Sequence, residues 1–407
     1  MLGVFMTVVA VVSPTFAQDV CTDIEANEAL YKKYLENYKG DITKETVAAR
    51  ETAVAAAKEY VEKYANCADY APQVTYLKKK GPELDELIKK VKLDWEAIAR
   101  ADRFNKAVPT GNAAEIYASG EDVLKYNPDQ IDVILVLATV GLDEAADKKN
   151  DTFNNKAIDY AKLAIKKIDE SAKSDKYGAF GYVYNTKENA IGWMNYTIGY
   201  IEFYRQKKEE SGLNYLYKST QVNSDTKNRA FIYAAIGDTF VGPADKLRQE
   251  IIEILKKEEK ETFESKSKLA LSKGYADRAI EAYAKAYEIE KANMAKETDA
   301  AKKAASQKYM DGLFTTLKVL YKFRYDTVEK PLAETELVQQ LNSHIASVAN
   351  KPLTSPTAEV KPVDPPTEEE ETTDTTTTSS TTTTTTTPAK TGTNGTTDKT
   401  TTKPKQR

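Results

Sequence analysis

Histidine, cysteine and any excess of positive charge are what this sequence has least of. His344 is the only histidine among 407 residues, so a Ser-His-Asp triad or a histidine-rich zinc site would depend on that one side chain. Gly178 and Gly181 lack the flanking strand and the following Lys-Ser/Thr pair of a phosphate loop. We therefore expect no enzyme, no catalytic residues, no cofactor and no metal, and we interpret His344 as an ordinary helix residue.

The charge balance argues against a second class of function. Lysine and arginine number 58 and aspartate and glutamate number 62, which gives a formal net charge of −4, and the two signs alternate along the chain. A nucleic-acid-binding protein needs a basic face that neutralises phosphates. We expect no nucleic-acid partner.

The longest apolar run lies at the N-terminus, from Leu2 to Val12, and is followed by Pro14 and the small residue Ala17. Residues 1–17 resemble a secretory signal peptide cleaved after Ala17. No lysine or arginine precedes the run, which leaves open a translation start further upstream. No other segment approaches the roughly 18 to 20 apolar residues of a membrane span. The mature chain is expected to carry no transmembrane segment and to be periplasmic, secreted or in the cell envelope.

Only two cysteines occur, Cys21 and Cys67. Helical spacing predicts helices over 24–38 and 46–65, with a turn at Gly40 between them. In an antiparallel helix pair the start of the first helix lies beside the end of the second, where the two cysteines fall. An oxidising compartment favours a Cys21–Cys67 disulfide, and two unrelated thiols are the alternative.

Proline and glycine are sparse and predict breaks between helices. The predicted breaks are Gly81-Pro82, Val108 to Gly111, Asn127 to Asp129, Gly242-Pro243 and Lys330-Pro331. Between them apolar residues recur at helical spacing, and no long alternating strand is present. The segment from Tyr177 to Tyr184 is interpreted as a loop between helices. The expected fold class is all-α.

A pattern of small and aromatic residues recurs along the middle of the chain. Its clearest copy has Gly274, Ala279, Tyr283 and Ala286, with Phe263 eleven residues before the glycine. Related patterns occur at Trp95, Ile98 and Ala99; at Ala157, Ala161 and Ala164; at Trp193, Tyr196 and Tyr200; at Gly212, Leu216 and Ser219; and at Tyr233, Ile236, Gly237 and Phe240. The pattern is similar to the tetratricopeptide repeat.

The resemblance implies an α-solenoid of antiparallel helix hairpins. Small residues such as Ala138, Gly237 and Ala279 would let helices approach closely, and rings such as Trp95 and Trp193 would fill the seams between hairpins. Tetratricopeptide repeats typically bind a protein or peptide in a concave groove lined by the first helices. The groove residues that the resemblance implies are Glu96, Arg100, Arg103, Leu135, Thr139, Met194, Ile198, Ala234 and Asp238. An irregular helical bundle is the alternative fold.

The expected organisation has five parts. Residues 18–81 form an N-terminal hairpin after the signal peptide, 82–292 form the repeats, and 293–350 form capping helices. The last part, 351–407, is rich in proline, glutamate and threonine and is expected to be disordered, because it has too few apolar residues to offset the entropy of ordering.

The leading functional hypothesis is an exported, non-enzymatic adaptor that binds a protein or peptide partner. One alternative is a structural envelope protein that its Thr-rich tail anchors or spaces. Another is a helical-solenoid enzyme acting on glycans through groove carboxylates such as Glu96. The oligomeric state and the identity of the partner are left open.

Overall fold

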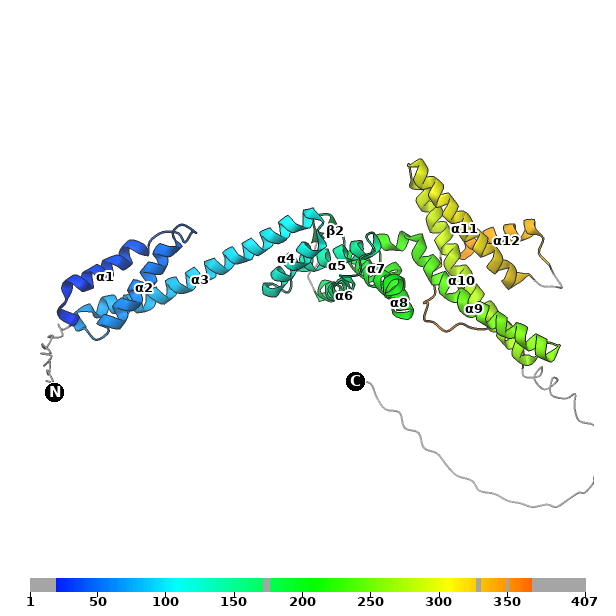
Figure 1. The fold of residues 1–407 in the computed structure, drawn as a ribbon, viewed down its shortest axis with the longest axis horizontal. Coiled ribbons are helices and arrows are strands. Elements are labelled where there is room, and N and C mark those ends of the chain that lie inside the picture. The colour runs from blue at the N-terminus through cyan, green and yellow to red at the C-terminus, as the bar shows by residue number, and fades with distance from the viewer. Residues whose placement is uncertain (1–19, 171–175, 327–330, 349–350, 368–407) are drawn as a thin grey trace, which may run out of the picture. The chain divides into compact units, whose positions relative to one another are not determined.

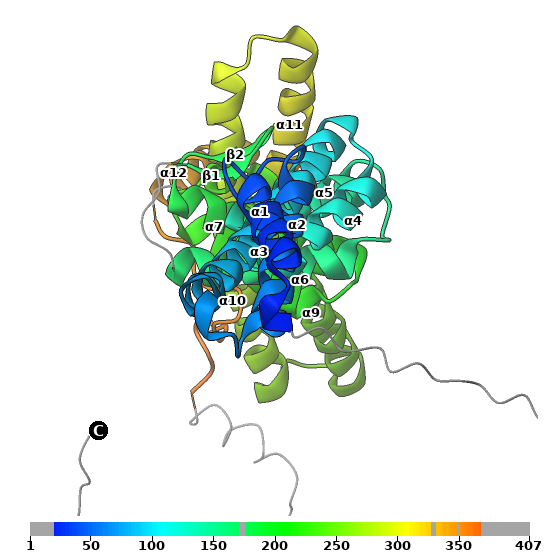
Figure 2. The same cartoon turned by 90° about the vertical axis from the view of Figure 1, so that its left-hand side faces the viewer.

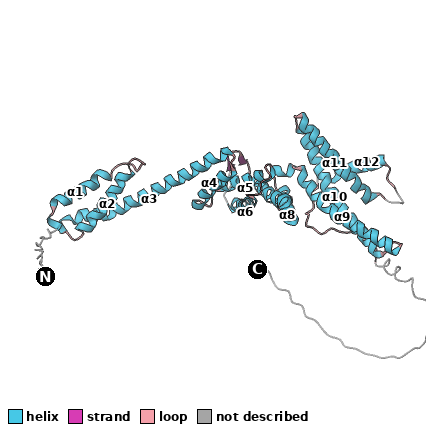
Figure 3. Ribbon diagram, viewed as in Figure 1, coloured by secondary structure: helices cyan, strands magenta, loops and turns pink. Residues whose placement is uncertain are grey.

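The computed structural model describes residues 20–170, 176–326, 331–348 and 351–367, and the predicted signal peptide lies outside them. The protein is all-α, as predicted, with one short pair of strands in the described chain (Figure 3). It divides into two compact units. Unit 1 extends to Ile232 and includes 355–357, and unit 2 comprises the described residues from Tyr233 to Thr354 and from Ala358 onward.

The elements follow one another in the order shown in Figure 1. The α-helices are α1 (Ile24–Asn37), α2 (Val47–Tyr64), α3 (Ala71–Ala107), α4 (Ala113–Tyr126), α5 (Ile131–Ala146), α6 (Asn154–Glu170), α7 (Lys187–Tyr200), α8 (Glu209–Gln221), α9 (Ala230–Glu258), α10 (Phe263–Lys296), α11 (Ala300–Tyr325) and α12 (Glu334–Val348). The strands are β1 (Tyr177–Ala179) and β2 (Tyr182–Tyr184). Short 3-10 turns are η1 (Val20–Thr22), η2 (Ala68–Tyr70), η3 (Val108–Thr110) and η5 (Asp225–Asn228), and η4 (Ile201–Arg205) is a π-helical turn that continues α7. Among the described helices, none is both long enough and apolar enough to cross a bilayer.

The first layer of unit 1 consists of α1, α2 and the beginning of α3. The predicted disulfide is present: Cys21 and Cys67 are bonded, with 5.4 Å between their Cα atoms. Beneath it lies a tyrosine-rich core in which Tyr34, Tyr60 and Tyr64 are almost fully buried. Asn27, itself buried, donates a hydrogen bond of 2.8 Å to the Tyr60 hydroxyl. The two helices predicted between the cysteines thus form with nearly the predicted bounds.

The predicted break at Gly81-Pro82 is wrong, because both residues lie inside α3. A proline within a helix removes one backbone hydrogen bond and normally kinks or ends the helix. Here the α3 residues on either side of the pair, Leu77 and Ile88, are buried, so packing favours one continuous helix over a break. The predicted boundary between 18–81 and 82–292 therefore does not fall at a helix end. Gly242-Pro243 likewise lies inside α9.

The rest of unit 1 is built around α5. Its sequence, IDVILVLATVGL, is apolar on every side, which is typical of a helix with neighbours all round. Val136 and Leu137 face the core shared with α4, whereas Leu135 and Ala138 face the core shared with α6 and α7. The alanines Ala157, Ala161 and Ala164 of α6 are fully buried, as the repeat pattern predicted.

The segment predicted as a loop at Tyr177 to Tyr184 is instead a β-hairpin, in which a two-residue turn joins β1 and β2. Gly178 has a φ of +88°, and a Cβ there would lie 2.0 Å from the Tyr182 carbonyl oxygen, so only glycine fits. Helix α5 holds the hairpin: Asp132 accepts a hydrogen bond from the Gly178 N–H (2.6 Å), and Asp143 accepts one from the Tyr182 hydroxyl (3.0 Å). Support from α5 explains how so short a strand pair is stable.

Asp143 provides a test of this attachment. Burial raises the pKa of its carboxyl, and the hydrogen bond from Tyr182 offsets only part of that rise. A carboxyl group whose pKa is higher in the folded than in the unfolded state contributes stability to the fold. This contribution is fully present at pH values below the unfolded-state pKa and is lost as the pH rises through the folded-state pKa. Asp143→Asn keeps an acceptor for Tyr182 without the buried charge.

We therefore expect Asp143→Asn to raise the urea midpoint at neutral pH, with no gain below about pH 3, where aspartate is largely protonated in both the folded and the unfolded state. Urea unfolding at several pH values measures this effect. The matched control is Asp159→Asn at an exposed position of α6. An equal gain in both variants at neutral pH would contradict the assignment.

Unit 2 begins with the antiparallel pair α9 and α10. Ser272 of α10 donates a hydrogen bond of 3.1 Å to the Ala244 carbonyl of α9, and Lys268 pairs with Glu250 at 2.7 Å. Nearer the start of α9, a Cβ at Gly237 would lie 2.9 Å from the Tyr283 ring. Gly237 therefore lies close to a ring of α10, and Ala279, one helical turn before Tyr283, is fully buried.

Helices α11 and α12 complete unit 2. Figure 2 shows α10 and α11 side by side as an antiparallel pair. The buried face of α11 includes Met310, Leu313 and Leu317. The single histidine, His344, is a helix residue of α12 whose ring lies 5.5 Å from that of Tyr321.

Residues 351–367 differ from the expectation of a disordered tail. Leu353 is buried, and the Val363 N–H donates a hydrogen bond of 2.8 Å to the Ala270 carbonyl of α10. The few apolar residues of this proline-rich stretch are enough to place it against a helix. The Thr-rich remainder, 368–407, lies outside the described residues.

Candidate functional site

The nine predicted groove residues do not form one surface. Leu135, Met194 and Ile198 have no exposed surface and belong to the core of unit 1. The hydroxyl of Thr139 donates to the Leu135 carbonyl (2.8 Å) and lies 2.7 Å from the Tyr184 hydroxyl. Their assignment to a groove is wrong, because α5 and α7 have neighbouring elements on several sides and leave no open face at these positions.

Two further groove residues belong to unit 2. Ala234 is buried, with 8% of its surface exposed. Asp238 is exposed, but its carboxylate accepts a hydrogen bond from the Tyr283 hydroxyl within the same unit. Asp238 therefore fixes a tyrosine between α9 and α10.

The remaining three, Glu96, Arg100 and Arg103, do lie together. They follow one another on α3 at intervals of four and three residues, which places them on one side of the helix. Arg100 is 91% buried; its Nη2 donates to Glu96 at 2.8 Å, and its guanidinium lies 3.4 Å from the centre of the Tyr126 ring. Asp122 accepts from Arg103 at 2.5 Å.

This arrangement follows from the length of α3. Its early turns bury Leu77 and Ile88 in the layer with α2, and its last turns bury Phe104 and Ala107 against α4. Between them, from about 93 to 99, most side chains are exposed. Leu93 is 60% exposed, and Tyr126 at the end of α4 is 56% exposed. We name Leu93, Glu96, Arg100, Arg103, Asp122 and Tyr126 the α3–α4 surface.

Trp95 was expected in a seam between hairpins. It is half-buried on the sparsely covered part of α3, outside the core clusters of unit 1 that surround α2 and α4. Trp193 fits the expectation better: it packs against the α5–α7 core, and its ring lies 5.6 Å from that of Tyr196. The difference arises because α3 runs from one layer to the next, whereas α7 lies inside a layer.

The chemistry available at the α3–α4 surface is that of binding. Glu96 and Arg103 are more than half exposed, so their ion pairs contribute little to stability and their charged groups are accessible to a partner. Arg100 stacks on Tyr126 and orients its ring. In the described chain no cluster of three or more His, Cys, Asp or Glu side chains is placed to hold a metal ion.

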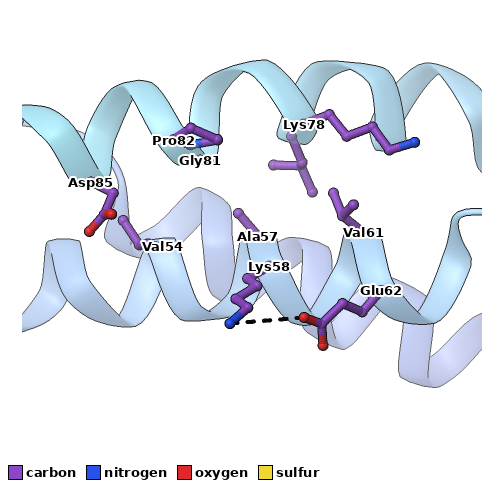
Figure 4. Close-up of a pocket in the computed structure, with 10 residues that line it drawn as sticks. Val54, Ala57, Lys58, Val61, Glu62, Lys78, Gly81, Pro82 and Asp85 are labelled. Carbon is purple, nitrogen blue, oxygen red and sulfur yellow. Dashed lines mark ion pairs between the residues drawn. The ribbon is translucent and has the colours of Figure 1, made fainter.

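Sequence reasoning missed a hollow between α2 and α3 (Figure 4). This cavity of about 380 Å³ has an apolar floor that includes Val54, Ala57 and Leu77, and it opens beside Gly81 and Pro82. Lys58 and Glu62 approach each other at its rim, 4.0 Å apart. A proline within otherwise regular helical spacing was the only signal in the sequence that pointed to this place.

Comparison with known proteins gave no indication of the function of the α3–α4 surface or of the cavity between α2 and α3. No protein-family model, no curated protein and no solved structure matches this chain. The case for function therefore rests on the residues described above.

Proposed function

We propose that this protein is an exported, non-enzymatic helical scaffold, built from hairpins similar to tetratricopeptide repeats, that binds a protein or peptide partner. The observation that carries the proposal is the α3–α4 surface, where the exposed side chains of Leu93 and Tyr126 lie beside the exposed charged groups of Glu96 and Arg103. The Gly237–Tyr283 contact and the buried alanines of α6 support the repeat resemblance. The disulfide supports export, because disulfides persist in oxidising compartments.

The partner is expected to place an apolar side chain between Leu93 and Tyr126. Aromatic and arginine residues are enriched where binding energy concentrates at interfaces. Tyr126 suits this role because Arg100 stacks on its ring and fixes it before the partner arrives. Arg103, which is 58% exposed, would then pair with an acidic group of the partner at the rim.

Leu93→Glu combined with Arg103→Glu tests the proposal. Leu93→Glu would bury an acidic group against the partner, and Arg103→Glu would reverse the charge at the edge of the interface. Together they should weaken partner binding at least tenfold. Affinity capture from an envelope extract, with quantitative comparison of the recovered proteins, measures this. Arg100 is left unchanged, because reversing a buried, stacked charge would disturb the fold.

The matched control is Val319→Glu, since Val319 is 62% exposed on α11 and Leu93 is 60% exposed on α3. The proposal requires at least one protein that the wild type and the Val319 variant recover and the α3–α4 variant loses. Identical recovery by all three would contradict it.

A further inference from the structure

The described end of the chain lies along helix α10. We call residues 351–354 and 358–367 the C-terminal strap, which is the orange segment beside α9 and α10 in Figure 1. Lys285 donates a hydrogen bond of 2.5 Å to the Lys351 carbonyl, Glu281 accepts one of 3.1 Å from the Thr354 N–H, and the Ala270 carbonyl accepts one of 2.8 Å from the Val363 N–H. The strap therefore runs antiparallel to α10.

One face of α10 is shaped to receive this backbone. Ala270, Gly274, Glu281 and Lys285 are spaced by four, seven and four residues, so they share one side of the helix. A Cβ at Gly274 would lie 2.1 Å from the Lys361 carbonyl oxygen. The repeat pattern attributes Gly274 to close helix packing, but its open side receives the strap. A glycine inside a helix is destabilising relative to alanine, and the close approach of the Lys361 carbonyl explains why glycine occupies this position.

A cleft with both apolar and charged lining residues continues beyond this contact. The cleft, of about 400 Å³, lies between α9, α10 and the end of the strap, lined by Ile251, Leu255 and Leu269 together with Val363 and Pro366 of the strap. Proline-bearing segments suit such a site, because they are already extended and lose little conformational entropy on binding.

The strap's hold on α10 is slight. Leu353 is the only strap residue that is fully buried; Val360, Val363 and Pro366 are half-buried, and most of the others are exposed. The contacts of the strap with α10 must offset the ordering entropy of the whole segment. The strap can detach by local opening, and a competing segment can then take its place.

We propose that this face of α9 and α10 is a peptide-binding site for extended, proline-containing segments, and that the strap is its resident, exchangeable ligand. The site lies in unit 2 and is independent of the α3–α4 surface.

The test uses the full chain and a fluorescein-labelled peptide with the sequence of residues 351–367. The double substitution Leu353→Asp and Val363→Asp is designed to detach the strap from α10, and we call this protein the strap variant. The peptide is expected to bind the strap variant at least tenfold more tightly than the wild type, as measured by fluorescence anisotropy. Adding Gly274→Ala to the strap variant should weaken peptide binding at least tenfold, because the new methyl group occupies the place of the Lys361 carbonyl.

The matched control is Gly312→Ala in the strap variant, since a Cβ at Gly312 on α11 meets nothing within 4 Å. It should leave peptide binding unchanged, and a scrambled peptide should not bind. Three results would each overturn the proposal: no binding to the strap variant, equal binding to the wild type and the strap variant, or binding that survives Gly274→Ala.

Hydrogen exchange of the otherwise unaltered full chain gives a second readout. Gly274→Ala alone should speed exchange of the Val363 amide, which is hydrogen-bonded to Ala270, at least tenfold without speeding exchange in α10, because alanine favours the helix. Unchanged exchange of the Val363 amide would contradict the close approach at Gly274. Neither readout depends on the partner of the α3–α4 surface, so the two proposals fail separately.

Discussion

Replacing Cys21 and Cys67 by alanine is expected to destabilise the first layer of unit 1 by about 4 kcal/mol, because the disulfide closes a loop across 46 sequence positions. Helix α1 begins three residues after Cys21, so the bond holds its first turn against the end of α2. Without it, α1 is held by packing around residues such as Tyr34 and Tyr60 and by hydrogen bonds such as the one from Asn27 to the Tyr60 hydroxyl. Hydrogen exchange of α1 should accelerate about a thousandfold.

Mass-spectrometric hydrogen exchange of peptides from 24–37 measures this effect. Wild-type protein in reducing buffer should match the double alanine variant, and the variant itself should not respond to the reductant. Unchanged protection of α1 after reduction would show that the tyrosine core alone holds the layer.

Gly199→Ala is expected to destabilise unit 1 by about 1–3 kcal/mol, although alanine is normally the better helix former. Gly199 of α7 and Gly212 of α8 face each other at a close crossing. A Cβ at Gly199 would lie 2.6 Å from the backbone nitrogen of Leu216, and one at Gly212 would lie 2.5 Å from that of Phe203. Because the obstacles are backbone atoms, the helices must move apart.

Urea unfolding of each variant measures the change, and Gly312→Ala is again the control. Gly312 lies in a helix with open space beside it, so alanine there should stabilise unit 2 by about 0.5–1 kcal/mol. Equal gains in the two variants would refute the close crossing of α7 and α8.

Local features of the fold were predictable from the sequence. The helices between the cysteines are bounded by turn residues, and their antiparallel pairing brings Cys21 beside Cys67. The breaks around Pro109 and Pro128 were also predicted correctly. Gly81-Pro82 and Gly242-Pro243 were not, because packing on both sides of a proline outweighs its local preference. Only the tertiary structure shows that packing.

The candidate site was harder to predict. A repeat pattern gives the period of a helix but not which of its faces a neighbour covers, so Met194 and Ile198 were placed in a groove although they are core residues. Glu96, Arg100 and Arg103 do lie together on α3, but only Glu96 and Arg103 are exposed, whereas Arg100 is buried and stacked on Tyr126. The strap was missed because its contacts join residues far apart in sequence, such as Ala270 and Val363.

Binding of a partner at the α3–α4 surface is the central claim, and titration calorimetry with a purified partner tests it most directly. The partner is a protein that the wild type recovers and the Leu93→Glu/Arg103→Glu variant loses. The account predicts a dissociation constant at least tenfold higher for that variant and unchanged for Val319→Glu. Equal dissociation constants for all three proteins would contradict it.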